Sequence, residues 1–171
     1  MLEEEGYEIV AETGRGDEAV AMVKELEPDL AILDIKMPGM DGLSAAREIA
    51  GERRAAVLIL TAFSQRDLVE QARDSGAMAY LVKPFERSDL LPAIEVALTR
   101  FGEIRALEAE VRSLEERLET RKWVDRAKGK LMDTQGLSEN DAFDFIQKTA
   151  MRQRVQMKVV AEQIVRGEIS P

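Results

Sequence analysis

Three polar residues stand where they could bind and accept a phosphoryl group. Asp34, Thr61 and Lys83 each stand at the end of a short apolar run. A carboxylate can attack phosphorus to form an aspartyl phosphate, a hydroxyl can donate a hydrogen bond to a phosphoryl oxygen, and an ammonium group can neutralise its charge. We therefore predict a small phosphoryl site centred on Asp34, with Mg²⁺ as the cofactor that balances the anionic oxygens.

A parallel sheet would bring these residues together, because open α/β sheets bind ligands at the carboxyl ends of their strands. From residue 7 to 100, short β-branched runs alternate with amphipathic stretches, which is typical of βαβ units. The runs Asp29–Asp34 and Ala56–Thr61 are almost continuously apolar, as in strands covered by helices on both faces. Two more strands are predicted at Tyr7–Glu12 and Ala79–Val82, so the first half is an α/β domain.

Helices are predicted between these strands, starting at residues that can cap a helix. The predicted starts are Asp17, Ser64 with Asp67, and Ser88. After Phe101 the apolar residues follow a heptad spacing of 3 and 4, namely Ile104, Leu107, Val111, Leu114 and Leu118. This short seam indicates either a two-chain coiled coil, and so a homodimer, or one long helix packed on its own domain.

The last fifty residues carry no strand pattern and are predicted to form a small all-α domain. Its helices are expected at Thr120–Asp133, Glu139–Arg152 and Val155–Val165, with Ser138 as the cap of the second. Most of the large apolar residues here are predicted to form the core of a bundle. They are Trp123, Phe143, Phe145, Met132 and Met151.

Charge is divided unevenly along the chain. The net charge is -9, and residues 1–100 hold 20 acids and 11 bases, but residues 121–158 hold 9 bases and 5 acids. A basic patch favours phosphate contacts, and an exposed Phe143 or Trp123 could stack on unpaired RNA bases. The second half is therefore a candidate for binding structured RNA.

Composition excludes several classes of protein. The chain has no cysteine and no histidine, which excludes disulfides, thiolate metal sites and histidine bases. No apolar run approaches 18 residues, and the N-terminus is acidic where a secretory signal would be basic. We predict a cytoplasmic protein without membrane contact, and not an enzyme.

The first half closely resembles the receiver domain of two-component response regulators, over residues 1 to about 100. The resemblance rests on Asp34, Thr61 and Lys83, on the segment that runs from Asp34 to Gly42, and on the sequence Lys83-Pro84-Phe85. It implies a flavodoxin-like fold and a sensor histidine kinase as partner. It also implies that Asp34 is the phosphoacceptor, that Thr61 and Lys83 sense the phosphoryl group, and that the Lys83–Pro84 bond is cis.

The resemblance assigns two further residues and leaves one gap. It implies that Tyr80 is the switch aromatic and that the backbone carbonyl of Lys36 joins Asp34 as a Mg²⁺ ligand. Receiver domains begin with a strand that ends in two acidic metal ligands, and the chain lacks that strand; Glu3–Glu5 are not that pair. We expect a start codon placed too far downstream or a missing segment, rather than a truncated protein that borrows a strand.

The second half resembles the ANTAR domain, an RNA-binding antitermination module. The matching motifs are Ala127-Lys-Gly-x-Leu-Met132, Gly136-x-Ser-Glu139, Ala142-Phe143, Ala150-Met151 and Val160-Ala161. The resemblance implies RNA contact by basic residues, namely Lys128, Lys148, Arg152, Arg154 and, more weakly, Lys158. An Arg often stands in the family where this chain has Gln147.

These expectations give a receiver domain at 1–100, a coiled-coil linker at 101–120 and an ANTAR domain at 121–171. The predicted function is a phosphorylation-controlled response regulator that binds RNA stem-loops to antiterminate transcription. The alternative is a degenerate receiver that acts as a phosphorylation-independent protein-interaction module.

Overall fold

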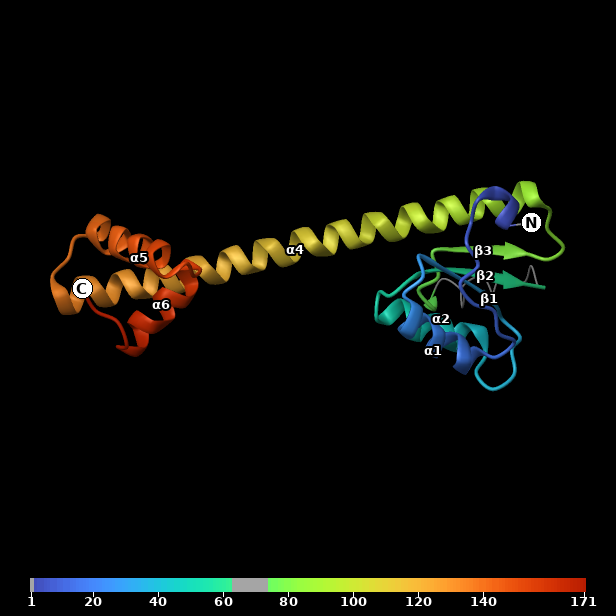
Figure 1. The fold of residues 1–171 in the computed structure, drawn as a ribbon, viewed down its shortest axis with the longest axis horizontal. Helices are drawn as coiled ribbons and strands as arrows, with labels where there is room; N and C mark the ends of the chain where they lie inside the picture. Colours follow the sequence, from blue (N-terminus) through green and yellow to red (C-terminus); the bar gives the residue numbers. More distant parts are fainter. Residues whose placement is uncertain (1, 63–73) are drawn as a thin grey trace. The chain divides into compact units, whose positions relative to one another are not determined.

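The computed structural model describes residues 2–62 and 74–171 and divides into two compact units, Met1–Leu107 and Glu108–Pro171. In the described part of the first unit, three parallel strands form a sheet in chain order. They are β1 (Leu30–Asp34), β2 (Ala56–Thr61) and β3 (Ala79–Val82), and all three point the same way (Figure 1). This sheet brings the three predicted site residues to one edge.

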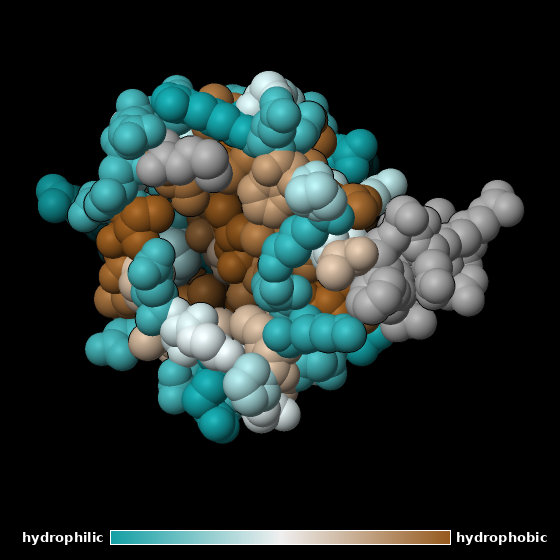
Figure 2. All heavy atoms as spheres, turned by 90° about the vertical axis from the view of Figure 1, so that its right-hand side faces the viewer, coloured by the Kyte–Doolittle hydropathy of each residue, from teal (hydrophilic) through white to brown (hydrophobic). Residues whose placement is uncertain are grey.

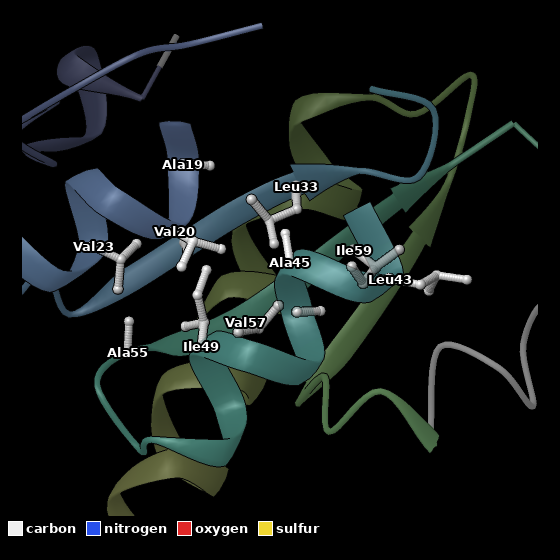
Figure 3. Packing of buried hydrophobic residues seen from close by; sticks show 12 residues of the cluster. Ala19, Val20, Val23, Leu33, Leu43, Ala45, Ile49, Ala55, Val57 and Ile59 are labelled. Atoms are coloured by element: carbon white, nitrogen blue, oxygen red, sulfur yellow. The ribbon is translucent and has the colours of Figure 1, made fainter. Parts of the chain in front are cut away.

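Both faces of the sheet are covered, as the continuous apolar runs predicted. Alternate side chains of a strand point to opposite faces. Val57 and Ile59 pack in a core with α1 (Gly16–Leu26) and α2 (Gly42–Gly51), which Figure 3 shows from close by. Leu58 between them packs on the other face, against the first turns of α4 (Arg87–Gln135).

The strand predicted at Tyr7–Glu12 is wrong, because this segment has no strand in the structure. A strand exists only where a neighbouring backbone accepts its ladder hydrogen bonds. Here a groove of about 190 Å³ is lined by Val10–Thr13, by α1 and by Leu30–Leu33 of β1. Seen from the side toward which the strands point, apolar side chains surround a hollow (Figure 2).

Before this segment, the acids Glu3–Glu5 form the single 3-10 turn η1. Glu4 and Glu5 pair with Arg87, the first residue of α4. Two of the N-terminal acids therefore form ion pairs with the start of α4.

Helix starts differ from the predicted capping residues. Helix α1 begins at Gly16, and Asp17 does not cap it but accepts a 2.7 Å hydrogen bond from Arg15. Helix α4 begins before Ser88, and the Asp89 carboxylate accepts from the backbone N–H of Glu86 at 2.9 Å. The predicted helix after Ser64 and Asp67 lies mainly outside the described residues.

Helix α4 unites segments that we predicted separately. It runs through the helix that begins near Ser88, the heptad segment and Thr120–Asp133 without a break. Its seam residues Leu107, Val111, Leu114 and Leu118 are 47% to 62% exposed. Ile104, the first seam residue, packs against the core cluster that contains Ala97 and Phe101, so the seam packs on its own domain only at its start and the four later residues remain in solvent.

The second unit packs the end of α4 against α5 (Glu139–Gln153) and α6 (Met157–Arg166). Ala127, Leu131 and Ile146 are among its buried core residues. The predicted cap is confirmed, since the Ser138 hydroxyl accepts from the backbone N–H of Asp141 at 3.2 Å. None of the helices in the described ranges combines the length and apolar character that crossing a bilayer requires.

Candidate functional site

Asp34 and Lys83 meet at the carboxyl edge of the sheet. The Lys83 ammonium donates to Oδ2 of Asp34 in a close ion pair, and each side chain is 39% exposed. The Asp34 carboxylate thus lies beside a cation and remains open to solvent. The Lys83–Pro84 peptide bond is cis, as expected.

Thr61 lies on the strand between them. Asp34 pairs with Leu60 in the register of β1 and β2, and Thr61 pairs with Val82 in the register of β2 and β3. Thr61 therefore lies one residue beyond the partner of Asp34, and Lys83 lies one residue beyond the partner of Thr61. Because neighbouring strands lie about 4.8 Å apart, Asp34, Thr61 and Lys83 share one end of the sheet. Thr61 is 3% exposed, so its side chain is almost fully buried.

The loop after Asp34 is closed tightly onto the strand. Gly42 donates from its backbone N–H to the carbonyl of Ile35 at 2.9 Å. A Cβ at Gly42 would lie 1.9 Å from the carbonyl oxygen of Asp34, so only glycine allows this approach. The Asp41 side chain caps α2 through the backbone N–H groups of Leu43 and Ser44. Sequence inspection assigned no role to Gly42 or Asp41, although the pair Asp-Gly is itself a turn signal.

Hydrogen bonds hold the Asp41 carboxylate in its ionised form. Its pKa lies below its ordinary value because the Ser44 hydroxyl and backbone N–H both donate to it. The protonated carboxyl accepts these bonds less strongly, so the cap is strongest when Asp41 is ionised.

The other two predicted receiver residues are Tyr80, which lies within β3, and Lys36, which lies two residues after Asp34. Tyr80 lies on β3 opposite Ile59, and it is 47% exposed. Lys36 donates its backbone N–H to Oδ1 of Asp34 at 3.3 Å. Residues 2–62 and 74–171 contain no group of three acidic side chains that could hold a metal ion. The described donors therefore fit only part of a Mg²⁺ ligand set.

In the second unit, two lysines of the motif at 127–132 form polar contacts between helices. Lys128 pairs with Asp125 at 2.9 Å and with Glu139 at 2.8 Å, and its side chain is only 17% exposed. The hydrogen bond to Glu139, followed by that to Asp125, raises the pKa of Lys128. Lys130 donates to the carbonyl of Val165 at 2.8 Å. Both cations thus hold the ends of α5 and α6 against α4.

The remaining predicted RNA residues are exposed or partly exposed. Lys148 pairs with Asp144, one helical turn away, at 3.1 Å. Arg154 ends α5 with a left-handed φ of 56°, and Lys158 lies in the first turn of α6. Within the described part of the chain, Arg152, Arg154 and Lys158 form no ion pair.

The predicted bundle core is only partly correct. Trp123 and Phe145 pack against the core cluster. Phe143, Met132 and Met151 are instead exposed on the surface. Phe143 and Met151 each directly follow a buried alanine, a spacing that places them beside the buried face of α5.

Comparison with known protein families identifies two domains in the chain. Residues 1–95 match the model of the response regulator receiver domain. Residues 112–165 match the model of the ANTAR domain. The chain belongs to the response regulators, with a receiver domain followed by an ANTAR domain.

Individual relatives agree with this assignment. The transcriptional regulatory protein PdtaR of Mycobacterium tuberculosis is 62% identical over 165 residues, which cover 96% of this chain and 80% of the relative. The chemotaxis protein CheY of Bacillus subtilis is 39% identical over 99 residues, covering 57% of this chain and 82% of CheY.

Solved receiver domains share the fold of the first half. The receiver domain of the sensor histidine kinase PA1611 from Pseudomonas aeruginosa, which has a magnesium ion in its active-site cleft, matches with a TM-score of 0.52 and 30% identity. The BeF3-activated receiver domain of RstA from Klebsiella pneumoniae matches with a TM-score of 0.52 and 29% identity. Each match covers 57% of this chain and 82% of the solved one.

Proposed function

We propose that this response regulator accepts a phosphoryl group on Asp34 and in that state binds structured RNA to antiterminate transcription in the cytoplasm. The contact between Asp34 and Lys83 is the observation that carries the first half of this proposal. The ANTAR domain in the same chain carries the second half.

The proposed phosphoryl transfer needs few groups from the protein. A carboxylate oxygen of Asp34 attacks phosphorus of a phosphohistidine in a sensor kinase, the P–N bond breaks, and the imidazole keeps the bonding electrons and takes up a proton. Lys83 and the Thr61 hydroxyl then contact the new phosphoryl oxygens. Among the described residues, Asp34 and the Lys36 carbonyl are our candidate donors to Mg²⁺, a cation that would offset charge there.

Regulation is proposed to pass along α4. This helix takes part in the core of the receiver unit and in the core of the ANTAR unit. Its exposed heptad seam fits pairing with the same seam of a second copy. Phosphorylation would favour this homodimer, and two ANTAR domains would then bind RNA together. In this scheme residues 101–120 are the coiled-coil linker between the two domains. The chain does not act as an enzyme on a diffusible substrate.

The phosphoacceptor is tested with acetyl phosphate and Mg²⁺, followed by mass spectrometry of the intact chain. The wild type should gain one phosphoryl group and Asp34→Asn none. Asp29→Asn is the matched control, since Asp29 is an exposed acid directly before the same strand, away from the end that carries Asp34. RNA binding without any phosphoryl gain would favour a phosphorylation-independent module instead.

A further inference from the structure

The start of α1 packs directly against the loop that connects β1 to α2. Gly16, the first residue of α1, lies so close to this loop that a Cβ there would stand 2.2 Å from the carbonyl oxygen of Met40. Gly39 has a left-handed φ of 79°, and a Cβ there would lie 2.8 Å from Nη2 of Arg15 and 2.8 Å from Oδ1 of Asp17. Two consecutive loop residues therefore touch the first residues of α1.

Arg15 and Asp17 form a bidentate ion pair beside Gly39. Nε of Arg15 donates to Oδ1 of Asp17 at 3.1 Å, and Nη2 donates to Oδ2 at 2.7 Å. The backbone N–H of Arg15 also donates to the Thr13 hydroxyl at 3.2 Å. Two parallel hydrogen bonds fix the orientation of both planar groups, which a single contact does not. The pair therefore has a defined place against the loop.

The other end of this loop contacts the Asp34 carboxylate. Lys36 donates its backbone N–H to Oδ1 of Asp34 at 3.3 Å. The loop is closed at its base, because Gly42 donates its backbone N–H to the carbonyl of Ile35 at 2.9 Å. In a closed loop a displacement at Gly39 also displaces the Lys36 N–H. The direction of the Asp34 carboxylate therefore depends on where the loop rests on α1.

We propose that the Arg15–Asp17 pair positions this loop for phosphoryl transfer to Asp34. Through the loop the pair sets the place of the Lys36 N–H, which orients the acceptor carboxylate. This inference rests on the proposed phosphoryl uptake by Asp34 and adds two positioning residues that act through the loop. Each side chain of the pair is 46% exposed, and exposed ion pairs contribute little to stability. The effect of the pair should appear in the rate of transfer, because that rate depends on orientation.

The experiment measures how fast the full chain gains a phosphoryl group from acetyl phosphate and Mg²⁺, by intact mass, over a range of acetyl phosphate concentrations. Asp17→Asn keeps the shape of the side chain and removes its charge. Glu48→Gln is the matched control, since Glu48 forms a similarly exposed ion pair at 2.7 Å with Lys24 in the last turn of α1. Gly16→Ala is compared with Gly14→Ala, because a Cβ at Gly14 would meet nothing within 4 Å.

Asp17→Asn should lower the maximal rate by about fivefold and leave the half-saturating concentration of acetyl phosphate unchanged, because the pair orients the acceptor and does not bind the donor. Arg15→Gln should have the same effect, and the double variant should lose no more than either single one, since both remove one interaction. In each variant, hydrogen exchange at the amides of Lys36 and Gly42 should be faster, while the temperature of thermal unfolding stays that of the wild type.

The glycine variants test the backbone contact by itself. Gly16→Ala should lower the maximal rate by about tenfold, because its Cβ displaces the Met40 carbonyl and the loop with it. Gly14→Ala and Glu48→Gln should both match the wild type in rate and in hydrogen exchange.

Two results would overturn the inference in different ways. If Asp17→Asn gains its phosphoryl group at the wild-type rate, or loses no more rate than Glu48→Gln, the pair does not position the loop, although the proposed phosphoryl uptake stands. If the wild type gains no phosphoryl group, the proposed function fails and the inference fails with it.

Discussion

The position of Asp34 depends on a neighbouring residue that has no side chain. Gly42 begins α2 directly against the carbonyl oxygen of Asp34. Gly42→Ala must push this carbonyl or the helix away, so we expect a loss of about 1–3 kcal/mol in the free energy of unfolding. Phosphoryl uptake from acetyl phosphate should also fall, because the acceptor carboxylate moves. Urea unfolding and intact-mass measurement check the two effects.

Gly51 offers a matched control at the other end of the same helix. A Cβ at Gly51 would meet nothing within 4 Å. Gly51→Ala should therefore leave phosphoryl uptake unchanged and leave stability equal or higher by up to about 1 kcal/mol, because alanine favours the helix. Equal destabilisation by both substitutions would contradict the role given to Gly42.

For single residues, the sequence alone could predict the position of those that stand at the end of a strand. Asp34, Thr61 and Lys83 each terminate an apolar run, and a parallel sheet collects strand ends at one edge. The pairing of Lys128 could not be predicted in this way. Its partner Glu139 is 11 residues away and reaches it only after the chain reverses between α4 and α5.

The cap of α2 gives a pH-dependent contribution to stability. Hydrogen bonds lower the pKa of Asp41 from its ordinary value of 3.8. Because the pKa of Asp41 is lower in the folded protein than in the unfolded chain, ionised Asp41 stabilises the fold above pH 3.8. This stabilisation is lost as the pH falls through the pKa of the folded protein. Asp41→Ala should cost about 1 kcal/mol at neutral pH. In urea unfolding, the difference in the free energy of unfolding between the wild type and Asp41→Ala should shrink below pH 3.8. A difference that stays constant with pH would contradict this role of Asp41.

At the end of α5, one substitution should change stability and RNA binding in opposite directions. Arg154 adopts a left-handed backbone with φ of 56°, where glycine is the more favourable residue. Arg154→Gly should therefore raise stability by up to about 1 kcal/mol. It should also weaken RNA binding and reduce its salt dependence, since one phosphate contact is lost. A stabilised variant with wild-type RNA affinity would exclude Arg154 from the RNA surface.

Elements defined by local signals were predictable, and those defined by a distant partner were not. The cap at Ser138 and the strand Ala56–Thr61 depend on adjacent residues, and both are found as predicted. Tyr7–Glu12 has an alternating pattern, but strand formation also requires a paired backbone, and here a groove separates it from such pairing. Exposure of Met151 likewise depends on how α5 and α6 pack.

For the molecule as a whole, the exposed seam of α4 predicts self-association. Leu114→Glu places a charge within the seam, whereas Ser113→Glu places the same side chain beside it. Sedimentation should show that Leu114→Glu weakens the homodimer and that Ser113→Glu leaves it unchanged. If both variants sediment like the wild type, the seam does not hold two copies together.

The central claim is that phosphorylation of Asp34 controls RNA binding, and one titration tests it most directly. Hairpin RNA is titrated with the wild type and with Asp34→Asn, each with and without acetyl phosphate and Mg²⁺. We expect the phosphodonor to tighten RNA binding of the wild type by roughly tenfold, within the usual range of coupling between two sites, and to leave Asp34→Asn unchanged. Equal affinities of the wild type under both conditions, or the same shift in Asp34→Asn, would contradict the account.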